Sequence, residues 1–294
     1  MSRKSSGIST RVPRGLVSKS IATDASPEEV WRALTDALMV EQWFGTLTPG
    51  LNTGETARLD FGDGDFFLIE DIRLERPHFL HYVWRFLGIG PFDSIDWRIA
   101  AKGSRCVVTV TDSEPLRSSE WAQELESGWL DFTERLERFL KTGEFARYDW
   151  SREIQAGIEL TCATSQAGKG LFRSTAGQTA WLPFNGPALQ SGGEVTIQDG
   201  GEPTRFFIRE VAYDSASCVQ FELSCDEWLN STRCFLELSP RSDNTMFTLR
   251  HKGWEGISYD GSEQLKQRKR FCVLWITALK NARRFIAEHC STQQ

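Results

Sequence analysis

Two long amphipathic stretches, one in each half of the chain, constrain its fold more than any other feature. Residues 119–141 place their large apolar side chains on one stripe of an α-helix. Residues 262–289 repeat the pattern, because the apolar positions that follow Trp275 fall at the same offsets as those that follow Trp129. Each stretch closes a segment of roughly 140 residues that is rich in predicted strands. We therefore predict a duplicated domain whose last element is a long helix.

The first half predicts two short helices followed by an antiparallel sheet. A strand at 15–22 precedes a helix that begins at Ser26, whose spacing to Glu29 is typical of a capping box, and a second helix at 38–43. Turn residues separate five further strands, at 53–61, 66–74, 78–87, 92–101 and 104–111. Bulky residues alternate along these strands, which indicates a curved sheet gripping the helix at 119–141.

The second half predicts a similar order with a less regular beginning. A strand at 154–163 precedes a Gly- and Ser-rich helical region at 168–182, in which Trp181 is the counterpart of Trp43. The remaining strands are predicted at 193–198, 204–213, 218–226, 231–239 and 245–252.

The predicted domain organisation has four parts. They are a flexible tail at 1–13, a first domain at 14–142, a linker at 143–153 and a second domain at 154–290. A chain of 294 residues agrees with two domains. Because the linker is short, we expect the two domains to pack on each other.

Charge and composition exclude several classes of function. The net charge is −6 and the sequence pI is about 5.4, so nucleic-acid binding is not expected. The basic residues Lys266, Arg268, Lys269 and Arg270 are interpreted as the solvent-exposed side of the last helix. No run of 18 apolar residues exists, so membrane insertion is not expected. The basic N-terminal stretch lacks an apolar core and is not a secretory signal, which favours a cytoplasmic protein.

Cysteine and histidine usage argues against a metal site. The seven cysteines form no CxxC pair, and none of the four histidines lies at ligand spacing from a cysteine. We interpret the cysteines as reduced core thiols and predict no metal and no cofactor.

Several motifs resemble one known family. Ser26–Asp36 and Glu41–Gly45 look like its opening helices, Pro77–Trp84 like its central strand and Ser127–Trp129 like the start of its last helix. Leu249–Trp254 is similar to its strand that ends in L-x-H-x-G-aromatic. The chain thus resembles the START/Bet v1-like superfamily and, within it, the AHSA1-like family related to the activator of Hsp90 ATPase. The resemblance implies an α+β fold of two tandem helix-grip domains, each a curved antiparallel sheet wrapped around a long C-terminal helix with a cavity between them.

Each half departs from the family pattern at one place. The first half has Thr109–Asp112 where the family's His-Lys-Gly-aromatic element belongs, and the second half lacks the Pro-Glu-Glu-Val-Trp opening. Both departures point to a reshaped or merged ligand pocket.

Aromatic residues supply the candidate site. Eleven Trp and nineteen Phe make the chain aromatic, and flat rings suit a planar apolar ligand, although each ring can instead simply fill the core. The predicted cavity-lining residues are Trp43, Tyr82, Trp84, Trp97, Trp129, Phe132, Trp181, Phe207, Phe221, Trp228, His251, Trp254 and Trp275.

Polar residues give a weaker signal for chemistry. For His251 a structural role is favoured over a ligand contact or an acid–base role. Of the carboxylates Glu70, Asp71, Asp93 and Asp96, most are expected to face solvent. No nucleophile elbow, phosphate-binding loop, dinucleotide fingerprint or zinc-protease motif is present, so no catalytic residue is assigned.

These features favour a non-catalytic protein that binds a hydrophobic small molecule, such as a polyketide, a polyene or a lipid. The resemblance extends this to carriage, sequestration or an accessory role in specialised metabolism, for example enediyne-type biosynthesis or self-resistance. One alternative is a cyclase, aromatase or hydrolase-like enzyme that uses a pocket histidine or carboxylate. Another is an Hsp90 co-chaperone-like interaction module. We expect a monomer or a weak dimer.

Overall fold

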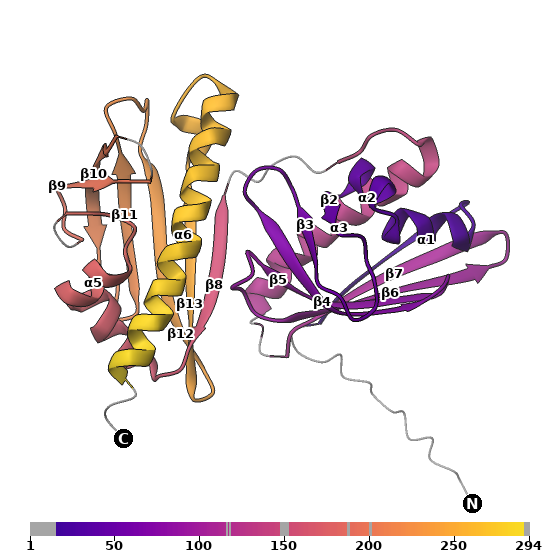
Figure 1. Ribbon diagram of the computed structural model, residues 1–294, viewed down its shortest axis with the longest axis horizontal. Coiled ribbons are helices and arrows are strands. Elements are labelled where there is room, and N and C mark those ends of the chain that lie inside the picture. The colour runs from indigo at the N-terminus through magenta and orange to yellow at the C-terminus, as the bar shows by residue number, and fades with distance from the viewer. Residues whose placement is uncertain are drawn as a thin grey trace, which may run out of the picture.

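The computed structural model describes residues 16–290 except 116, 118, 148–152, 187–188 and 200–201 (Figure 1). At 119–121, 124 and 290 it describes the backbone alone. The predicted tail at 1–13 and much of the predicted linker at 143–153 lie outside the described residues. The described chain forms two antiparallel sheets, each accompanied by one long helix (Figure 1).

The first sheet has seven strands in the order β1-β7-β6-β5-β4-β3-β2. Its strands are β1 (Leu16–Thr23), β2 (Thr46–Thr48), β3 (Ala57–Asp60), β4 (Phe66–Glu75), β5 (Phe79–Phe86), β6 (Asp93–Lys102) and β7 (Arg105–Ser113). The helices of this domain are α1 (Pro27–Thr35), α2 (Ala37–Trp43) and α3 (Ser119–Thr142). The predicted capping box at Ser26 and Glu29 is present. The short strand β2 was not predicted, and it follows α2 directly.

The second sheet has six strands in the order β8-β13-β12-β11-β10-β9. Its strands are β8 (Ile154–Leu160), β9 (Gly193–Ile197), β10 (Thr204–Ala212), β11 (Cys218–Ser224), β12 (Thr232–Arg241) and β13 (Asn244–Lys252). The helices are α4 (Thr164–Ala167), the π-helix η1 (Gly168–Arg173), α5 (Thr175–Trp181), the 3₁₀ turn η2 (Trp254–Gly256) and α6 (Gly261–Cys290).

The two long helices pack on their sheets as the periodicity predicts. Trp129 and Leu136 of α3 are buried in the core of the first domain, and Trp275 and Leu279 of α6 in the core of the second. None of the described helices is long and apolar enough to cross a membrane. The predicted fold of two tandem helix-grip domains is confirmed.

The duplication is also visible in matching hydrogen bonds of the short helices. Trp43 Nε1 donates to the carbonyl of Ala33 at 2.8 Å, and Trp181 Nε1 donates to the carbonyl of Leu171 at 3.1 Å. In both cases the acceptor lies 10 residues earlier in the chain. The second helical region therefore performs the same packing role as α1 and α2, despite its different sequence.

Close packing explains why that second helical region is rich in glycine. A Cβ atom on Gly177 would lie 1.8 Å from the carbonyl oxygen of Gly170, a distance that no side chain tolerates. The glycines thus allow η1 and α5 to approach each other directly.

In each domain, a tryptophan on the long helix donates a hydrogen bond to the strand that comes last in chain order. Trp129 Nε1 donates to Asp112 Oδ2 of β7 at 2.7 Å, and Trp275 Nε1 donates to His251 Nδ1 of β13 at 2.9 Å. Each domain therefore has an equivalent hydrogen bond between helix and sheet. Its acceptor is a carboxylate in the first domain and an imidazole in the second.

The turn between β3 and β4 packs against α6 and joins the two domains. Arg268 of α6 is 0% exposed, and its Nη2 lies 2.5 Å from Asp65 Oδ2. Its guanidinium also donates to the carbonyls of Asp63 and Glu153, at 3.2 and 3.1 Å. Gly64, with a φ of +100°, brings the turn against the helix.

The expectation that Arg268 faces solvent is therefore wrong. Lys266 is exposed as expected, but the turn of the first domain covers the next positions of α6. A second ion pair between the domains joins Arg241 of β12 to Glu114, just after β7. These contacts agree with the expectation that the domains pack on each other.

Candidate functional site

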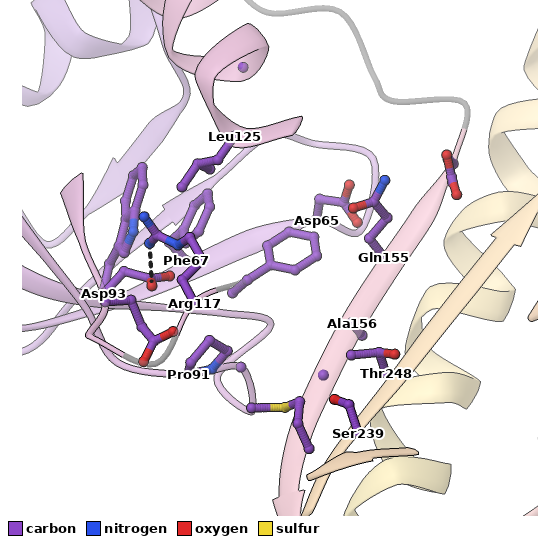
Figure 2. A pocket seen from close by; sticks show the side chains of 18 of the residues that line it. Asp65, Phe67, Pro91, Asp93, Arg117, Leu125, Gln155, Ala156, Ser239 and Thr248 are labelled. Carbon is purple, nitrogen blue, oxygen red and sulfur yellow. Dashed lines mark hydrogen bonds and ion pairs between the residues drawn. The ribbon is translucent and has the colours of Figure 1, made fainter. Parts of the chain in front are cut away.

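A cavity of about 480 Å³ lies where the two domains meet. The first domain contributes an aromatic wall, a polar end and part of α3, and the second domain contributes the outer face of its sheet. Figure 2 shows Phe67, Leu125 and Arg117 of the first domain across from Gln155 and Thr248 of the second.

The aromatic wall comes mainly from β4, β5 and α3. Trp84 is at its centre and stacks on Phe67 at a ring-centroid distance of 3.8 Å and on Trp129 at 5.3 Å. Phe132 of α3 stacks parallel to Phe61 at 6.2 Å. Trp84, Phe67, Phe61 and Phe132 all line the cavity, so a bound molecule would meet rigid aromatic surface.

The polar end consists of two carboxyl groups that share one guanidinium. Arg117 Nη2 lies 2.7 Å from Asp93 Oδ1 and 2.5 Å from Asp112 Oδ1. The Arg117 side chain is 4% exposed and that of Asp93 is 15% exposed. Asp112 also accepts the Trp129 hydrogen bond, so this group is connected to the helix that the sheet surrounds.

Burial and neighbouring charge shift the proton equilibria of both carboxyl groups. Burial, together with the nearby charge of Asp112, raises the pKa of Asp93 to about 7, although Arg117 opposes the shift. Burial also raises the pKa of Asp112, against the opposing effects of Arg117 and Trp129. Asp93 can therefore be protonated or ionised near neutral pH.

Strand alternation places these carboxyl groups on the inner face of the sheet. Asp93 has the same parity on β6 as the buried Ile95 and Trp97, and Asp112 has the same parity on β7 as the buried Val110. Asp93 is therefore an exception to the expectation that most of the four carboxylates face solvent. Continuing each apolar alternation to the end of its strand would have located both residues from the sequence.

The second domain closes the cavity with the outer face of its sheet. Gln155 of β8, Thr248 and Met246 of β13, and Ser239 of β12 line this side. These positions alternate with buried residues of the same strands, so the core of the second domain lies behind them. The uncharged polar groups among them can form hydrogen bonds to a bound molecule.

Gly128 keeps one side of the cavity open. It lies within α3 and lines the cavity, and a Cβ atom built at this position meets nothing within 4 Å. Glycine inside a helix costs about 1 kcal/mol relative to alanine. Packing among the described residues therefore does not require glycine at this position, and the space beside it is part of the cavity.

Comparison with known proteins places the chain in a family. Residues 24–141 match the family model of the activator of Hsp90 ATPase homolog 1-like proteins. The solved structure of DynU16, a protein in the dynemicin biosynthetic locus, is 31% identical, with a TM-score of 0.84; the alignment covers 93% of this chain and 100% of DynU16. The chain belongs to the AHSA1-like family.

Other solved structures are similar at lower identity. The di-domain ARO/CYC StfQ from the steffimycin biosynthetic pathway is 12% identical, with a TM-score of 0.38, over 94% of this chain and 100% of StfQ. The Aha1 dimer from Colwellia psychrerythraea is 21% identical, with a TM-score of 0.38, over 44% of this chain and 97% of that one. No curated protein matches the chain.

In the first AHSA1-like domain, the predicted site residues occupy one aromatic cluster. Trp84 and Phe132 lie on the cavity wall. Tyr82, Trp97 and Trp129 are buried directly behind that wall, where Trp97 Nε1 donates to Tyr82 Oη at 3.1 Å. Trp43 is also fully buried, and its ring meets that of Trp97 edge-on at 6.4 Å.

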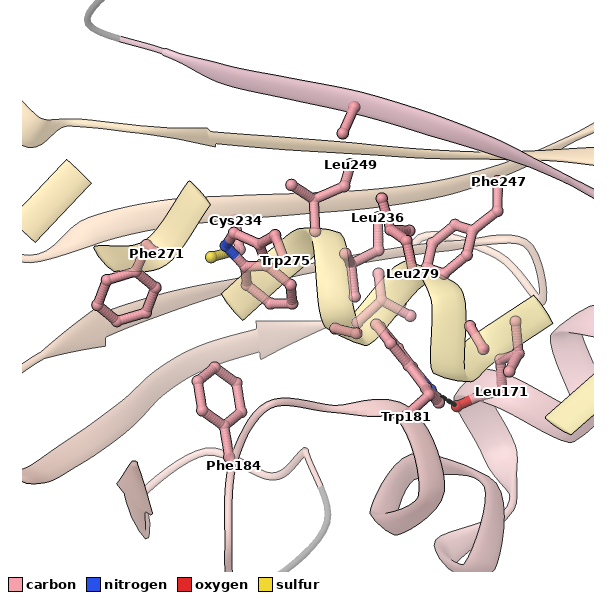
Figure 3. Close-up of a cluster of buried hydrophobic side chains, with 14 of the residues drawn as sticks. Leu171, Trp181, Phe184, Cys234, Leu236, Phe247, Leu249, Phe271, Trp275 and Leu279 are labelled. Carbon is pink, nitrogen blue, oxygen red and sulfur yellow. Dashed lines mark hydrogen bonds between the residues drawn. The ribbon is translucent and has the colours of Figure 1, made fainter. Parts of the chain in front are cut away.

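In the second domain, most predicted site residues fill the core. Figure 3 shows Trp181, Phe184 and Phe247 packed around α6, which carries Trp275. Phe221, Trp254 and His251 are also fully buried. Trp228 packs against this core but is only partly buried.

Phe207 does not point into this interior. On β10 the buried residues are Phe206 and Ile208, so the predicted inward position is occupied by the preceding residue. The two adjacent phenylalanines made the strand register ambiguous, because either can supply the apolar face.

Both ring nitrogens of His251 have partners within the core. Nδ1 accepts from Trp275 Nε1 at 2.9 Å, so Nε2 carries the proton and donates to Thr232 Oγ1 at 2.8 Å. Burial lowers the pKa of His251 to about 3, which keeps the ring neutral. This geometry favours the structural interpretation of His251. Whether any of the thirteen predicted residues contacts a ligand stays a prediction.

Proposed function

We propose that the protein binds a hydrophobic, ring-containing small molecule in the cavity between its two domains. The observation that carries the proposal is a cavity that combines an aromatic wall with a buried carboxyl–guanidinium group and is covered by the sheet of the second domain. A volume of about 480 Å³ lies within the range typical of small-molecule sites.

A role in specialised metabolism is the second part of the proposal. DynU16, which aligns over nearly the whole chain, comes from the dynemicin biosynthetic locus. We infer that this protein carries, sequesters or presents a hydrophobic product or intermediate of such a pathway. The rigid aromatic wall and the enclosure by two domains support a role in binding this molecule without changing it.

A catalytic role is a second candidate, and Asp93 is the reason for it. Asp93 lines the cavity, and burial brings its pKa to about 7, where one carboxyl group can both donate and accept a proton. Cyclisation or dehydration of a bound polyketide needs such proton transfers. Product formation from a bound substrate, lost on Asp93→Asn but not on Asp96→Asn, would separate catalysis from binding.

Fluorescence of N-phenyl-1-naphthylamine tests binding directly. This neutral dye emits strongly only when it leaves water. We expect the full chain to enhance its emission in a saturable manner. Gly128→Phe should abolish the enhancement, because the new ring would occupy the open space beside Gly128.

Two variants control for effects on folding. Gly128→Ala should retain dye binding, because it adds one methyl group and favours the helix. Gly50→Phe also places its ring in open space, but outside the cavity, and should bind as the wild type does. The proposal would be contradicted if the folded wild-type protein did not enhance the dye emission, or if Gly128→Phe bound the dye as tightly as the wild type.

A further inference from the structure

We propose that the cavity selects ligands whose polar end is a hydrogen-bond donor, a hydroxyl or an ammonium group, and discriminates against carboxylates. The inference rests on the proposed function and adds the chemical class of the ligand to it. It is carried by the arrangement of charged groups at the polar end of the cavity.

The charged groups at this end include more acids than bases. Three carboxyl groups, those of Asp93, Asp112 and Glu114, face two guanidinium groups, those of Arg117 and Arg241. Arg117 is bound by two of the carboxyl groups, and Arg241 reaches across the domain boundary to the third. A ligand carboxylate would add a fourth carboxyl group to this partly buried site, and the cost of burying its charge opposes binding.

Asp93 is the acceptor that remains for a ligand. Its Oδ1 is bound by Arg117, whereas among the described residues no donor lies within hydrogen-bond distance of its Oδ2. Its side chain lines the cavity and is partly exposed. A donor group on a ligand would give this second oxygen its missing partner.

The aromatic wall places rings beside that oxygen. Asp93 is directly opposite Trp84 in the β5–β6 register, so both side chains lie on the same face of the sheet. Trp84 in turn stacks on Phe67. A molecule whose donor group meets Asp93 can therefore lay its rings along this wall.

A matched series of naphthalenes tests the selection. The probes are 2-naphthol, 1-naphthylmethylamine, 2-naphthoate and 2-methylnaphthalene, titrated by calorimetry into the full chain at pH 8. We expect the naphthol and the amine to bind about tenfold or more tightly than 2-naphthoate, the ratio expected for one charge-assisted hydrogen bond. The uncharged methyl compound should fall between them.

Asp93→Asn should reduce this preference to about threefold or less, because the negative acceptor is lost. Asp96→Asn is the matched control, since Asp96 lies on the opposite face of β6 and pairs with His81 outside the cavity. It should leave the preference unchanged. The comparison of probes on the wild-type protein does not depend on the folding of either variant.

The outcomes separate the two proposals. If none of the four probes binds, the proposed function fails. If 2-naphthoate binds as tightly as the donor probes, or if Asp93→Asn keeps the full preference, binding stands and the inferred selectivity is overturned.

Discussion

Asp112 and His251 hold equivalent positions, yet they give the two domains different interiors. Each accepts the indole hydrogen bond of its long helix. His251 is neutral, has a partner on both nitrogens and is enclosed by large apolar side chains. Asp112 instead shares Arg117 with Asp93, and this group opens onto the cavity. The acceptor on this strand thus belongs to the buried core in the second domain and to the polar end of the cavity in the first.

Asp93 should make the stability of the protein depend on pH. Its pKa is about 7 in the folded state and about 4 in an unfolded chain, so the folded state retains the extra proton between these values. The stability contributed by Asp93 is therefore present below pH 4 and is lost as the pH rises to about 7. The free energy of unfolding of Asp93→Asn, relative to the wild type, should rise by on the order of 2–4 kcal/mol between pH 4 and pH 8.

Urea denaturation of both proteins across this pH range measures that difference. Groups that do not interact with Asp93, such as Asp65 and His251, titrate in both proteins and cancel in the comparison. Parallel stability curves for the two proteins would show that Asp93 titrates normally.

Replacing His251 should cost stability without changing ligand binding. His251→Ala leaves the buried Trp275 donor without an acceptor, removes one of the two partners of the Thr232 hydroxyl and creates a void, at a cost of about 3 kcal/mol or more. The exposed His78→Ala should change the free energy of unfolding by about 0.5 kcal/mol or less. A strong loss of ligand affinity in folded His251→Ala would instead assign His251 to the site.

At the scale of elements, periodicity predicted the location and the inner face of strands and helices. It did not predict which segments of the other domain pack on them. The 3.6-residue pattern located α3 and α6, and alternation identified the inner face of β6. Nothing in the local pattern of α6 shows that a turn from 200 residues earlier covers Arg268, because such contacts depend on the docking of two folded domains. The inward positions of Asp93 and Asp112 were not predicted for a different reason, since these residues extend apolar alternations by one polar position.

Arg268 should be the charged residue that contributes most to docking. Arg268→Met leaves Asp65 buried without its cation, and breaking such a pair costs about 3–5 kcal/mol at neutral pH. Burial already raises the pKa of Asp65 to about 6, so Asp65 can take a proton in mild acid and the loss should shrink below pH 6. Thermal unfolding at pH 5 and pH 8 measures the difference.

Lys266→Met is the control for that substitution, because Lys266 lies on the same helix but is exposed. Its effect on stability should be small at both pH values. A destabilisation by Arg268→Met that is equal at pH 5 and pH 8 would contradict the role given to Asp65.

At the scale of the molecule, the two domains together enclose the proposed binding cavity, and the sheet of the second domain covers it. The first domain contributes the buried acids Glu114 and Asp65. The second domain supplies Arg241 and Arg268, which form ion pairs with them. The same contact brings Gln155 and Thr248 over the cavity. The enclosed position of the site therefore depends on domain docking, and we expect ligand exchange to require that the domains separate.

A disulfide between the domains tests this expectation. A Cβ atom on Gly64 would lie 3.4 Å from Cys272 Cβ, close to the spacing found in disulfides. Oxidised Gly64→Cys should therefore release a bound naphthalene more slowly than the reduced protein does. Gly62→Cys, which carries similar strain at a φ of +82°, has no nearby cysteine and should show no such difference. Equal release by cross-linked and reduced Gly64→Cys would show that the ligand leaves by another route.

A crystal structure of the full chain soaked with 2-naphthol tests the central claim most directly. The account predicts that the naphthalene ring lies against Phe67 and Phe132, beneath Gln155 and Thr248, with its hydroxyl within hydrogen-bond distance of Asp93. A ring bound inside the second domain, or only on the outer surface while this cavity contains solvent alone, would contradict it.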